Sequence, residues 1–217
     1  MPMATSKVLL IRHADVENPR NVLYGHIEGF GLSTLGRAQA EALGERLRPD
    51  PPNVIVHSPL QRAVETTNLI NGKLESPAPL EVDPELREAD FSRYLQGVPY
   101  WQIPMRRPLW FVHKTRRGLL PGDESIEQLG GRVLNVMYAL AAAHPGQRTA
   151  LVSHADPLQA AWILLDRRPG TEREMYRKSI AKAGMLEVEL DGTRLVGLAY
   201  TPPPTAAAPA AAPPIKG

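Results

Sequence analysis

Two short stretches of the chain each join an apolar run to a histidine. VLLIRHAD covers residues 8–15 and TALVSHAD covers residues 149–156. Each run ends at a histidine followed by alanine and aspartate, and Arg12 directly precedes the first histidine, His13. Arginine binds phosphate through paired hydrogen bonds, and neutral imidazole is a nucleophile. The repeated pattern therefore indicates phosphoryl chemistry at the ends of two buried strands.

A third apolar run, NVIV at residues 53–56, leads to Arg62 in the first turn of the following predicted helix. The carboxyl ends of parallel strands share one edge of a sheet, where helix N-termini add free N–H groups. We therefore expect one phosphate pocket formed by Arg12, His13, Arg62 and His154. Because a nearby positive charge disfavours imidazolium, the guanidinium groups are expected to keep His13 neutral.

Strands that alternate with helices must position these side chains, which predicts an α/β domain. We expect a three-layer sandwich, in which helices flank a mainly parallel central sheet. Strands are predicted at 8–11, 53–56, 79–83 and 149–153, helices at 33–47, 59–70, 123–143 and 156–165, and a hairpin at 185–200 with Asp191-Gly192 as its turn.

The domain organisation follows from composition. Residues 1–200 are predicted to form a single domain, in which residues 88–123 are a small irregular insertion over the active site, rich in arginine, aromatic residues and proline. Residues 201–217 contain mostly proline and alanine and have little to bury, so they are predicted to form an extended tail.

The gross composition limits the classes of partner and compartment. The chain has 217 residues, a formal net charge of +2 and no cysteine, which excludes disulfides and thiolate metal sites. So small a net charge gives no argument for nucleic acid. No apolar run has the length of a leader or a membrane span. We expect a cytoplasmic protein with no nucleic-acid or membrane partner, and a homodimer is one open option.

Five motifs follow one another along about residues 7–165: LIRHAD, LSTLGRAQAEALGERL, VHSPLQRAVETT, LREADFSRYLQG and ALVSHADP. In this order they resemble the histidine phosphatase superfamily, also called the phosphoglycerate mutase-like family. It implies that His13 is phosphorylated during turnover and that Glu88 is the acid and later the base. It implies no metal or other cofactor. The side chains implied to hold the phosphoryl group are Arg12, Arg62 and His154.

The sequence departs from the family pattern at several positions. Ala14 replaces the usual glycine, and Val16 replaces the usual serine or threonine. The family's asparagine matches Asn18 only with a one-residue gap, and Asn18 is the remaining candidate for substrate binding. Phe91-Ser92 and Leu95–Gly97 replace the usual FG and WEG. These changes bear on substrate identity more than on the reaction. The apolar and aromatic surroundings of Glu88 are expected to raise its pKa.

The favoured function is a metal-independent phosphomonoesterase that acts on a small phosphorylated metabolite through a phosphohistidine. A phosphoglycerate mutase is the first alternative, although family mutases carry a long insertion where only 65 residues separate Glu88 from His154. A non-catalytic phosphate-binding protein is the second, but the key residues are all present. A metallohydrolase using His13/Asp15 and His154/Asp156 is the third, and a chelator titration of activity would separate it.

The other histidines and the basic residues have plainer interpretations. His57 also ends a strand and is predicted to be structural or at the pocket rim. His26, His113 and His144 are predicted to be solvated. A basic cluster is predicted to form a solvated face, with attraction of an acidic substrate to the pocket mouth as the alternative; its members are Arg106, Arg107, Lys114, Arg116 and Arg117.

Overall fold

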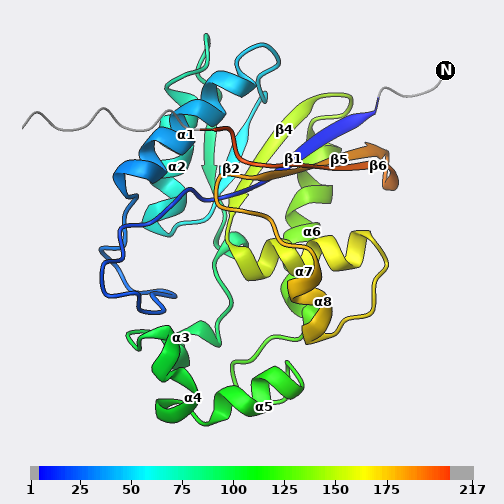
Figure 1. The fold of residues 1–217 in the computed structure, drawn as a ribbon. Coiled ribbons are helices and arrows are strands. Elements are labelled where there is room, and N and C mark those ends of the chain that lie inside the picture. Colours follow the sequence, from blue (N-terminus) through cyan, green and yellow to red (C-terminus); the bar gives the residue numbers. More distant parts are fainter. Residues whose placement is uncertain (1–4, 206–217) are drawn as a thin grey trace, which may run out of the picture.

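The computed structural model describes residues 5–205, so most of the predicted tail lies outside the described residues (Figure 1). The strands are β1 (Ser6–Arg12), β2 (Ile55–His57), β3 (Leu80–Val82), β4 (Arg148–Ser153), β5 (Met185–Asp191) and β6 (Arg194–Thr201). The helices are α1 (Thr34–Leu47), α2 (Gln61–Asn71), α3 (Ser92–Leu95), α4 (Ile103–Arg106), α5 (Leu109–Thr115), α6 (Ile126–Ala143), α7 (Ala155–Leu165) and α8 (Glu172–Arg177), with short 3₁₀ helices at Pro84–Leu86 and Tyr100–Gln102.

The six strands form one sheet in the order β3-β2-β4-β1-β5-β6. β3, β2, β4 and β1 run parallel to one another, whereas β5 and β6 form an antiparallel hairpin at the β1 edge. The predicted mainly parallel sheet is therefore confirmed. Because β1 and β4 are neighbours and β4 also pairs with β2, the three strands predicted to carry the site end side by side.

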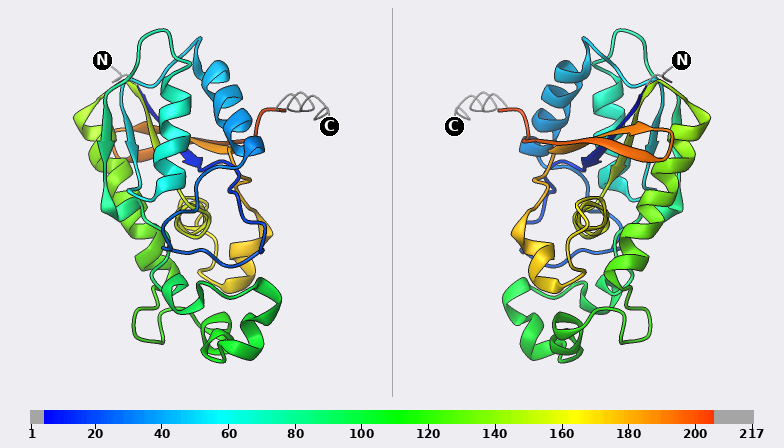
Figure 2. Two further views of the ribbon diagram at one scale, coloured as in Figure 1. Left: turned by 90° about the vertical axis from the view of Figure 1, so that its left-hand side faces the viewer. Right: turned by 90° about the vertical axis from the view of Figure 1, so that its right-hand side faces the viewer.

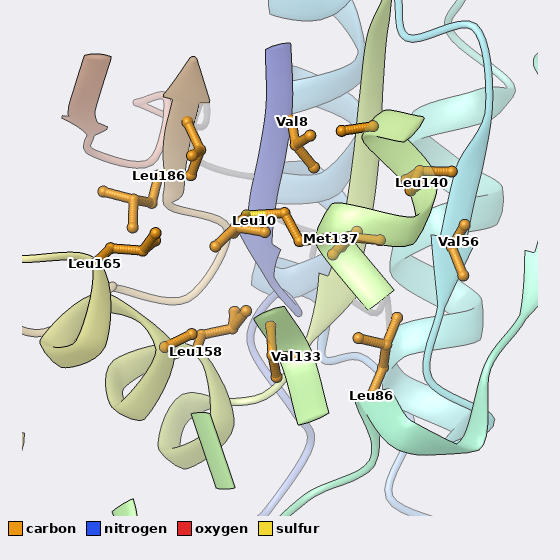
Figure 3. Close-up of a cluster of buried hydrophobic side chains, with 14 of the residues drawn as sticks. Val8, Leu10, Val56, Leu86, Val133, Met137, Leu140, Leu158, Leu165 and Leu186 are labelled. Atoms are coloured by element: carbon orange, nitrogen blue, oxygen red, sulfur yellow. The ribbon is translucent and has the colours of Figure 1, made fainter. Parts of the chain in front are cut away.

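Helices cover both faces of the sheet, which confirms the predicted three layers (Figure 2). Side chains alternate along β1, so that Val8 and Leu10 pack with α6 and α7 (Figure 3). Leu9 and Ile11 point to the opposite face, where they pack with α1 and α2. All four are fully buried. A continuous apolar run is what a strand covered on both faces requires.

Local signals explain most element boundaries, with three small corrections, of which the first is that the helix predicted from residue 123 begins at Ile126. Ser33 caps α1 by accepting a hydrogen bond from the Gly36 N–H, and Ser125 forms a capping box with Gln128 at the start of α6. The helix predicted from Pro59 instead begins at Gln61, because the backbone before it stays extended. The hairpin turn is shifted by one residue to 192–193, where Gly192 adopts a φ of 61°.

The predicted irregular insertion, residues 88–123, contains the short helices α3, α4 and α5, which lie apart from the sheet (Figure 1). They pack around a separate apolar cluster of Phe91, Leu95, Val98 and Ile103. Helices of four to seven residues depend on such packing more than on periodicity, so the sequence pattern did not reveal them. The six-residue α8 was missed for the same reason. None of the helices in residues 5–205 is long and apolar enough to cross a membrane.

Candidate active site

The predicted convergence at the strand ends is present. Arg12 ends β1 and is followed by His13, while His154 directly follows β4. The rings of His13 and His154 lie 5.2 Å apart between centroids. Arg62, in the first turn of α2, places its Nε 3.3 Å from His13 Nε2. Two arginines and two histidines therefore meet at one edge of the sheet.

Two hydrogen bonds determine which nitrogen of His13 carries the proton. Nδ1 lies 2.8 Å from the carbonyl oxygen of Ala14, which can only accept, so Nδ1 donates. Nε2 faces the Nε–H of Arg62 and must accept. Burial, and then the charges of Arg62 and Arg12, lower the pKa of this histidine well below its ordinary value. His13 is thus neutral, with the lone pair on Nε2.

The two arginines are fixed by backbone carbonyls. Arg62 is 1% exposed, donates from Nη2 to the Gly25 oxygen at 2.9 Å and lies 4.8 Å from the centre of the Tyr24 ring. Arg12 donates from Nη1 to the Ile180 oxygen at 2.8 Å, while its Nε is buried without a partner among the described residues. Both guanidinium groups are held in place beside His13, as binding an anion there requires.

His154 links the end of β4 to the start of α7. Its Nε2 lies 2.7 Å from the hydroxyl of Ser58, and its buried Nδ1 has no partner within residues 5–205. Burial and the charge of Arg62 lower the pKa of His154 well below its ordinary value. Within residues 5–205 no side chain caps α7, so the N–H groups of Ala155 and Asp156 remain available at the site; Pro157, the next residue, has none.

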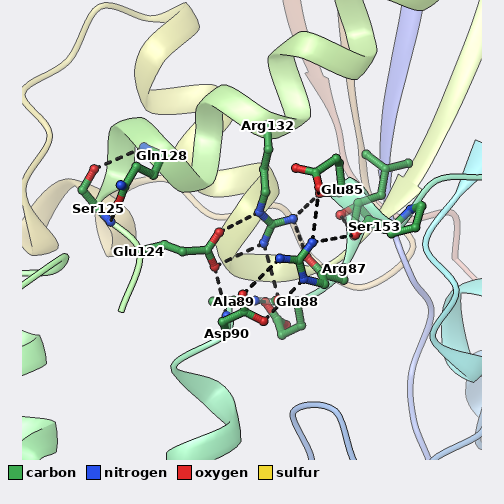
Figure 4. Close-up of polar contacts among 12 residues, drawn as sticks. Glu85, Arg87, Glu88, Ala89, Asp90, Glu124, Ser125, Gln128, Arg132 and Ser153 are labelled. Carbon is green, nitrogen blue, oxygen red and sulfur yellow. Dashed lines mark hydrogen bonds and ion pairs between the residues drawn. The ribbon is translucent and has the colours of Figure 1, made fainter. Parts of the chain in front are cut away.

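The backbone on both sides of Glu88 is fixed by hydrogen bonds to the side chains of Arg132 and Glu124 (Figure 4). The Arg132 guanidinium donates to the carbonyl oxygen of Arg87 at 2.7 Å and forms an ion pair with Glu124 at 2.8 Å. Glu124 in turn accepts a hydrogen bond from the Asp90 N–H at 2.9 Å. The segment on both sides of Glu88 is therefore attached to α6. Arg132 was not singled out in the sequence, although an arginine between Leu129 and Val133 on the apolar face of a helix was an available signal.

The carboxyl group of Glu88 lies in the cavity wall, where it accepts a hydrogen bond from the Ala89 N–H at 3.0 Å. Burial and the negative charge of Asp156 raise its pKa, which confirms the expectation from its apolar surroundings. For Asp156 the effect of burial is outweighed by an ion pair with Arg117 at 3.0 Å, and its pKa is lowered. Neighbouring carboxyl groups whose pKa values are pushed apart are typical of acid–base sites.

A cavity of about 370 Å³ opens in front of these residues. Arg12, His13 and Glu88 line it, whereas Arg62 and His154 are buried against His13 rather than in the wall. The rest of the wall comes from three parts of the chain: the segment after β1, the start of α7 with α8, and the insertion. The insertion contributes Ala89, Phe91, Ser92, Leu95, Tyr100, Ile103, Pro104, Trp110, His113 and Lys114.

The structure does not bring Asn18 to this cavity. Its side-chain amide donates to the Val22 carbonyl oxygen at 2.8 Å and accepts from the Val22 N–H at 3.1 Å, so it closes a turn of the loop. His57 is buried at the end of β2 and also lies outside the cavity wall, as expected for a structural residue. Tyr24 and Ser58 touch the site instead and were not assigned a role from the sequence.

The prediction of solvated histidines is wrong for two of the three. The His26 side chain is 4% exposed, and His113 is buried with its ring stacked on Phe91. The prediction that the basic cluster forms a solvated face is also wrong for Arg117. Its side chain is 4% exposed and forms ion pairs with Glu172 and Asp156. These partners lie far away in the sequence. Arg106 and Arg116 are exposed as predicted.

The two His-x-Asp pairs do not form a common set of metal ligands. Asp15 pairs with Lys182 and accepts a hydrogen bond from the Ser33 hydroxyl at 2.6 Å. Asp156 is paired with Arg117. In the part of the chain that the structure describes, no three histidine, aspartate or glutamate side chains are grouped as a metal site would require.

Comparison with known proteins identifies the family. The model of the histidine phosphatase superfamily (branch 1) matches residues 8–201. This chain belongs to that superfamily. An uncharacterized protein of Mycobacterium tuberculosis is 31% identical over 94% of this chain and 98% of its own length. A metal-independent phosphoserine phosphatase of Arabidopsis thaliana is 30% identical over 73% of this chain and 68% of its own length.

A solved structure has the same fold. The solved structure of YhfR from Bacillus stearothermophilus matches with a TM-score of 0.78 and 22% identity, over 88% of this chain and 94% of that one. This similarity confirms the α/β fold. The family match and the phosphatase among the sequence relatives support a phosphatase, and hence hydrolase, activity. The expected resemblance is therefore confirmed for the family and the class of enzyme.

Proposed function

We propose that the chain is a phosphomonoesterase that requires no metal and acts on a small phosphorylated metabolite through a phosphohistidine at His13. The protonation of His13 carries the proposal, because Nδ1 donates to a carbonyl and leaves the lone pair on Nε2 in a site with two arginines. In this proposal residues 88–123 cap the site within a single domain formed by residues 1–200. Asn18 has no role in it.

In the first step, Nε2 of His13 attacks phosphorus while the bond from phosphorus to the leaving oxygen breaks. Arg12, Arg62 and the free N–H groups of α7 offset the negative charge of the phosphoryl group during transfer. His154, with its unpartnered nitrogen, lies beside the same position. Glu88, whose pKa is raised, gives its proton to the leaving alkoxide. The alcohol departs and His13 carries the phosphoryl group.

In the second step, water attacks the phosphohistidine. The Glu88 carboxylate, which lost its proton in the first step, accepts a proton from that water. The bond from phosphorus to Nε2 breaks, inorganic phosphate forms, and His13 recovers its neutral state. Both steps use the same two side chains, so one site completes the cycle. The ion pair of Asp156 with Arg117 keeps a fixed negative charge near Glu88, which favours its protonated form.

Rapid quenching of the protein with a ³²P-labelled phosphomonoester tests the assignment of His13. We expect a phosphoprotein that is labile in acid and stable in base, with no label in His13→Ala. The matched control is His57→Gln, which changes a histidine that ends β2, the strand on the far side of β4, and lies outside the cavity. Label in His13→Ala, or its loss only in the control, would contradict the proposal.

The same phosphoprotein separates a phosphatase from a mutase. A phosphatase should lose the label to inorganic phosphate in water at the rate of turnover. A phosphoenzyme that persists in water and discharges rapidly onto added phosphoglycerate identifies a mutase instead.

A further inference from the structure

Beyond the phosphate, the cavity has a composition that selects the alcohol part of the substrate. We propose that the preferred substrates are phosphomonoesters of an uncharged, largely apolar alcohol, with an alkyl or aryl body that lies against the insertion. This inference rests on the proposed function, and names the class of substrate for the same site. It follows from which groups line the cavity and which of them are already paired.

The wall opposite the phosphate end is apolar. Leu23 comes from the segment after β1, and the insertion contributes Phe91, Leu95, Ile103, Pro104 and Trp110. Ile103, Phe91 and Leu95 belong to one packed cluster, against which Trp110 and Leu23 also lie. A wall supported in this way keeps its shape when the site is empty. An alcohol with hydrocarbon groups gains from removing this surface from water, whereas a sugar does not.

The charged groups that reach the cavity beyond Arg12, His13 and Glu88 are satisfied within the protein. Lys114 contacts Glu172 and the Tyr176 hydroxyl, and its ammonium lies 4.6 Å from the centre of the Tyr176 ring. Glu172 also pairs with Arg117, which pairs with Asp156. This group contains two cations and two carboxylates, so it offers no net charge to a ligand.

His113 adds no cation either. Its Nδ1 lies 2.9 Å from Asp123, its ring stacks on Phe91 at 4.3 Å, and burial together with Arg117 lowers its pKa. Among the described residues that line the cavity, Arg12 is thus the only cation without a carboxylate partner, and it belongs to the phosphate end. A second anionic group on the substrate would be buried without compensation, which is costly.

The remaining polar groups are neutral hydroxyls. Ser92 Oγ is buried and has no partner within the described residues 5–205, and burial raises the pKa of Tyr100 to about 12. They can bind one uncharged oxygen or nitrogen of a ligand. A cavity of about 370 Å³ lies near the small end of the range for small-molecule sites. The alcohol is therefore small.

Binding of phosphonates, which cannot be hydrolysed, tests the substrate class without turnover. Titration calorimetry compares methyl-, propyl- and hexylphosphonate, and compares hexylphosphonate with 6-phosphonohexanoate, which has the same number of carbons and an added carboxylate. We expect the Kd to fall by up to about fourfold for each buried methylene (about 0.8 kcal/mol). We expect 6-phosphonohexanoate to bind more weakly than hexylphosphonate.

A matched pair of variants locates the apolar subsite. Trp110→Ala removes an indole from the cavity wall, whereas Trp101→Ala removes one that is 71% exposed on the same insertion and outside the cavity. Trp110→Ala should raise the Kd of hexylphosphonate by about tenfold and leave the Kd of methylphosphonate unchanged. Trp101→Ala should change neither Kd.

The outcomes separate this inference from the proposed function. Equal affinity for methyl- and hexylphosphonate, or tighter binding of 6-phosphonohexanoate, would overturn the apolar substrate class even if His13 is phosphorylated. If both tryptophan variants change the Kd equally, the alcohol does not bind against Trp110. If phosphorylation of His13 fails while the chain-length dependence holds, the proposed mechanism is wrong and the ligand class stands.

Discussion

Arg62 is the side chain whose replacement tests most directly how the site is built. Its guanidinium donates from Nε to His13 and from Nη2 to Gly25, two directions that one lysine ammonium cannot reproduce. We therefore consider Arg62→Ala, which removes the charge, and Arg62→Lys, which keeps the charge and loses the geometry.

The expected loss follows from the type of contact. Removing one partner of a buried, charged hydrogen-bonding pair costs about 2–5 kcal/mol, which corresponds to about 30- to 5,000-fold in kcat/KM for Arg62→Ala. The contact serves both substrate and transition state, so KM should rise while kcat falls. For Arg62→Lys the loss in kcat/KM should lie near the lower end of this range, because the remaining ammonium still offsets the phosphoryl charge.

Steady-state kinetics on an alkyl phosphate, with the melting temperature of each variant, measure this effect. The control is Arg37→Lys: this side chain is 55% exposed and pairs with Glu65 on the outer side of α2, and its change should leave kcat/KM within about twofold. A loss below about threefold in Arg62→Ala, less than about 1 kcal/mol, would refute a phosphate-binding role for Arg62.

Three further predictions concern the acid, its support and the two buried histidines. In single turnover, Glu88→Gln should slow phosphorylation of His13 about 10²- to 10⁴-fold with an alkyl phosphate and much less with p-nitrophenyl phosphate, whose leaving group needs no proton; equal losses would remove the acid role. Arg132→Met frees the segment that carries Glu88 and should reduce kcat by up to about 100-fold with the same dependence on leaving group, while a uniform loss on both esters would mean that Arg132 is only structural. Burial lowers the pKa of His13 and His154, whereas both titrate near 6.5 in the unfolded chain, so below about pH 6.5 the unfolded state binds more protons. The free energy of unfolding should therefore fall as the pH drops from 7, by up to about 1.4 kcal/mol per pH unit for each histidine, and a denaturant titration of His13→Gln should show a shallower slope than the wild type.

The parts of the site carried by the sheet could be predicted from the sequence. Val8–Ile11 and Ala150–Val152 are apolar without interruption, as a strand covered on both faces requires. Once both are placed as parallel strands, the positions of His13 and His154 follow, because parallel strands end at one edge. Two apolar runs and one topological rule were therefore enough to bring these two histidines together.

The parts that depend on distant partners could not be predicted. Arg117 reads as one of several surface arginines, and only the fold brings it to Asp156 and Glu172. In the same way, Arg132 supports Glu88 from a helix more than 40 residues further along the chain. The short helices of the insertion have too few turns to give a periodic signal. The match of Asn18 to a family position required a gap, and its side chain instead closes a local turn.

Under the proposed function, the site has two ends, one for the phosphoryl group and one for the alcohol. The phosphate end rests on β1, β4 and α2, whose buried residues belong to the clusters on the two faces of the sheet. The other end rests on the insertion, whose cluster of Phe91, Leu95, Val98 and Ile103 is separate from both. Side chains that share no packing partners contribute almost independently to stability. Residues of the insertion can therefore change the preferred alcohol while Arg62 and His13 keep their geometry, which is why substrate preference is best sought in the insertion.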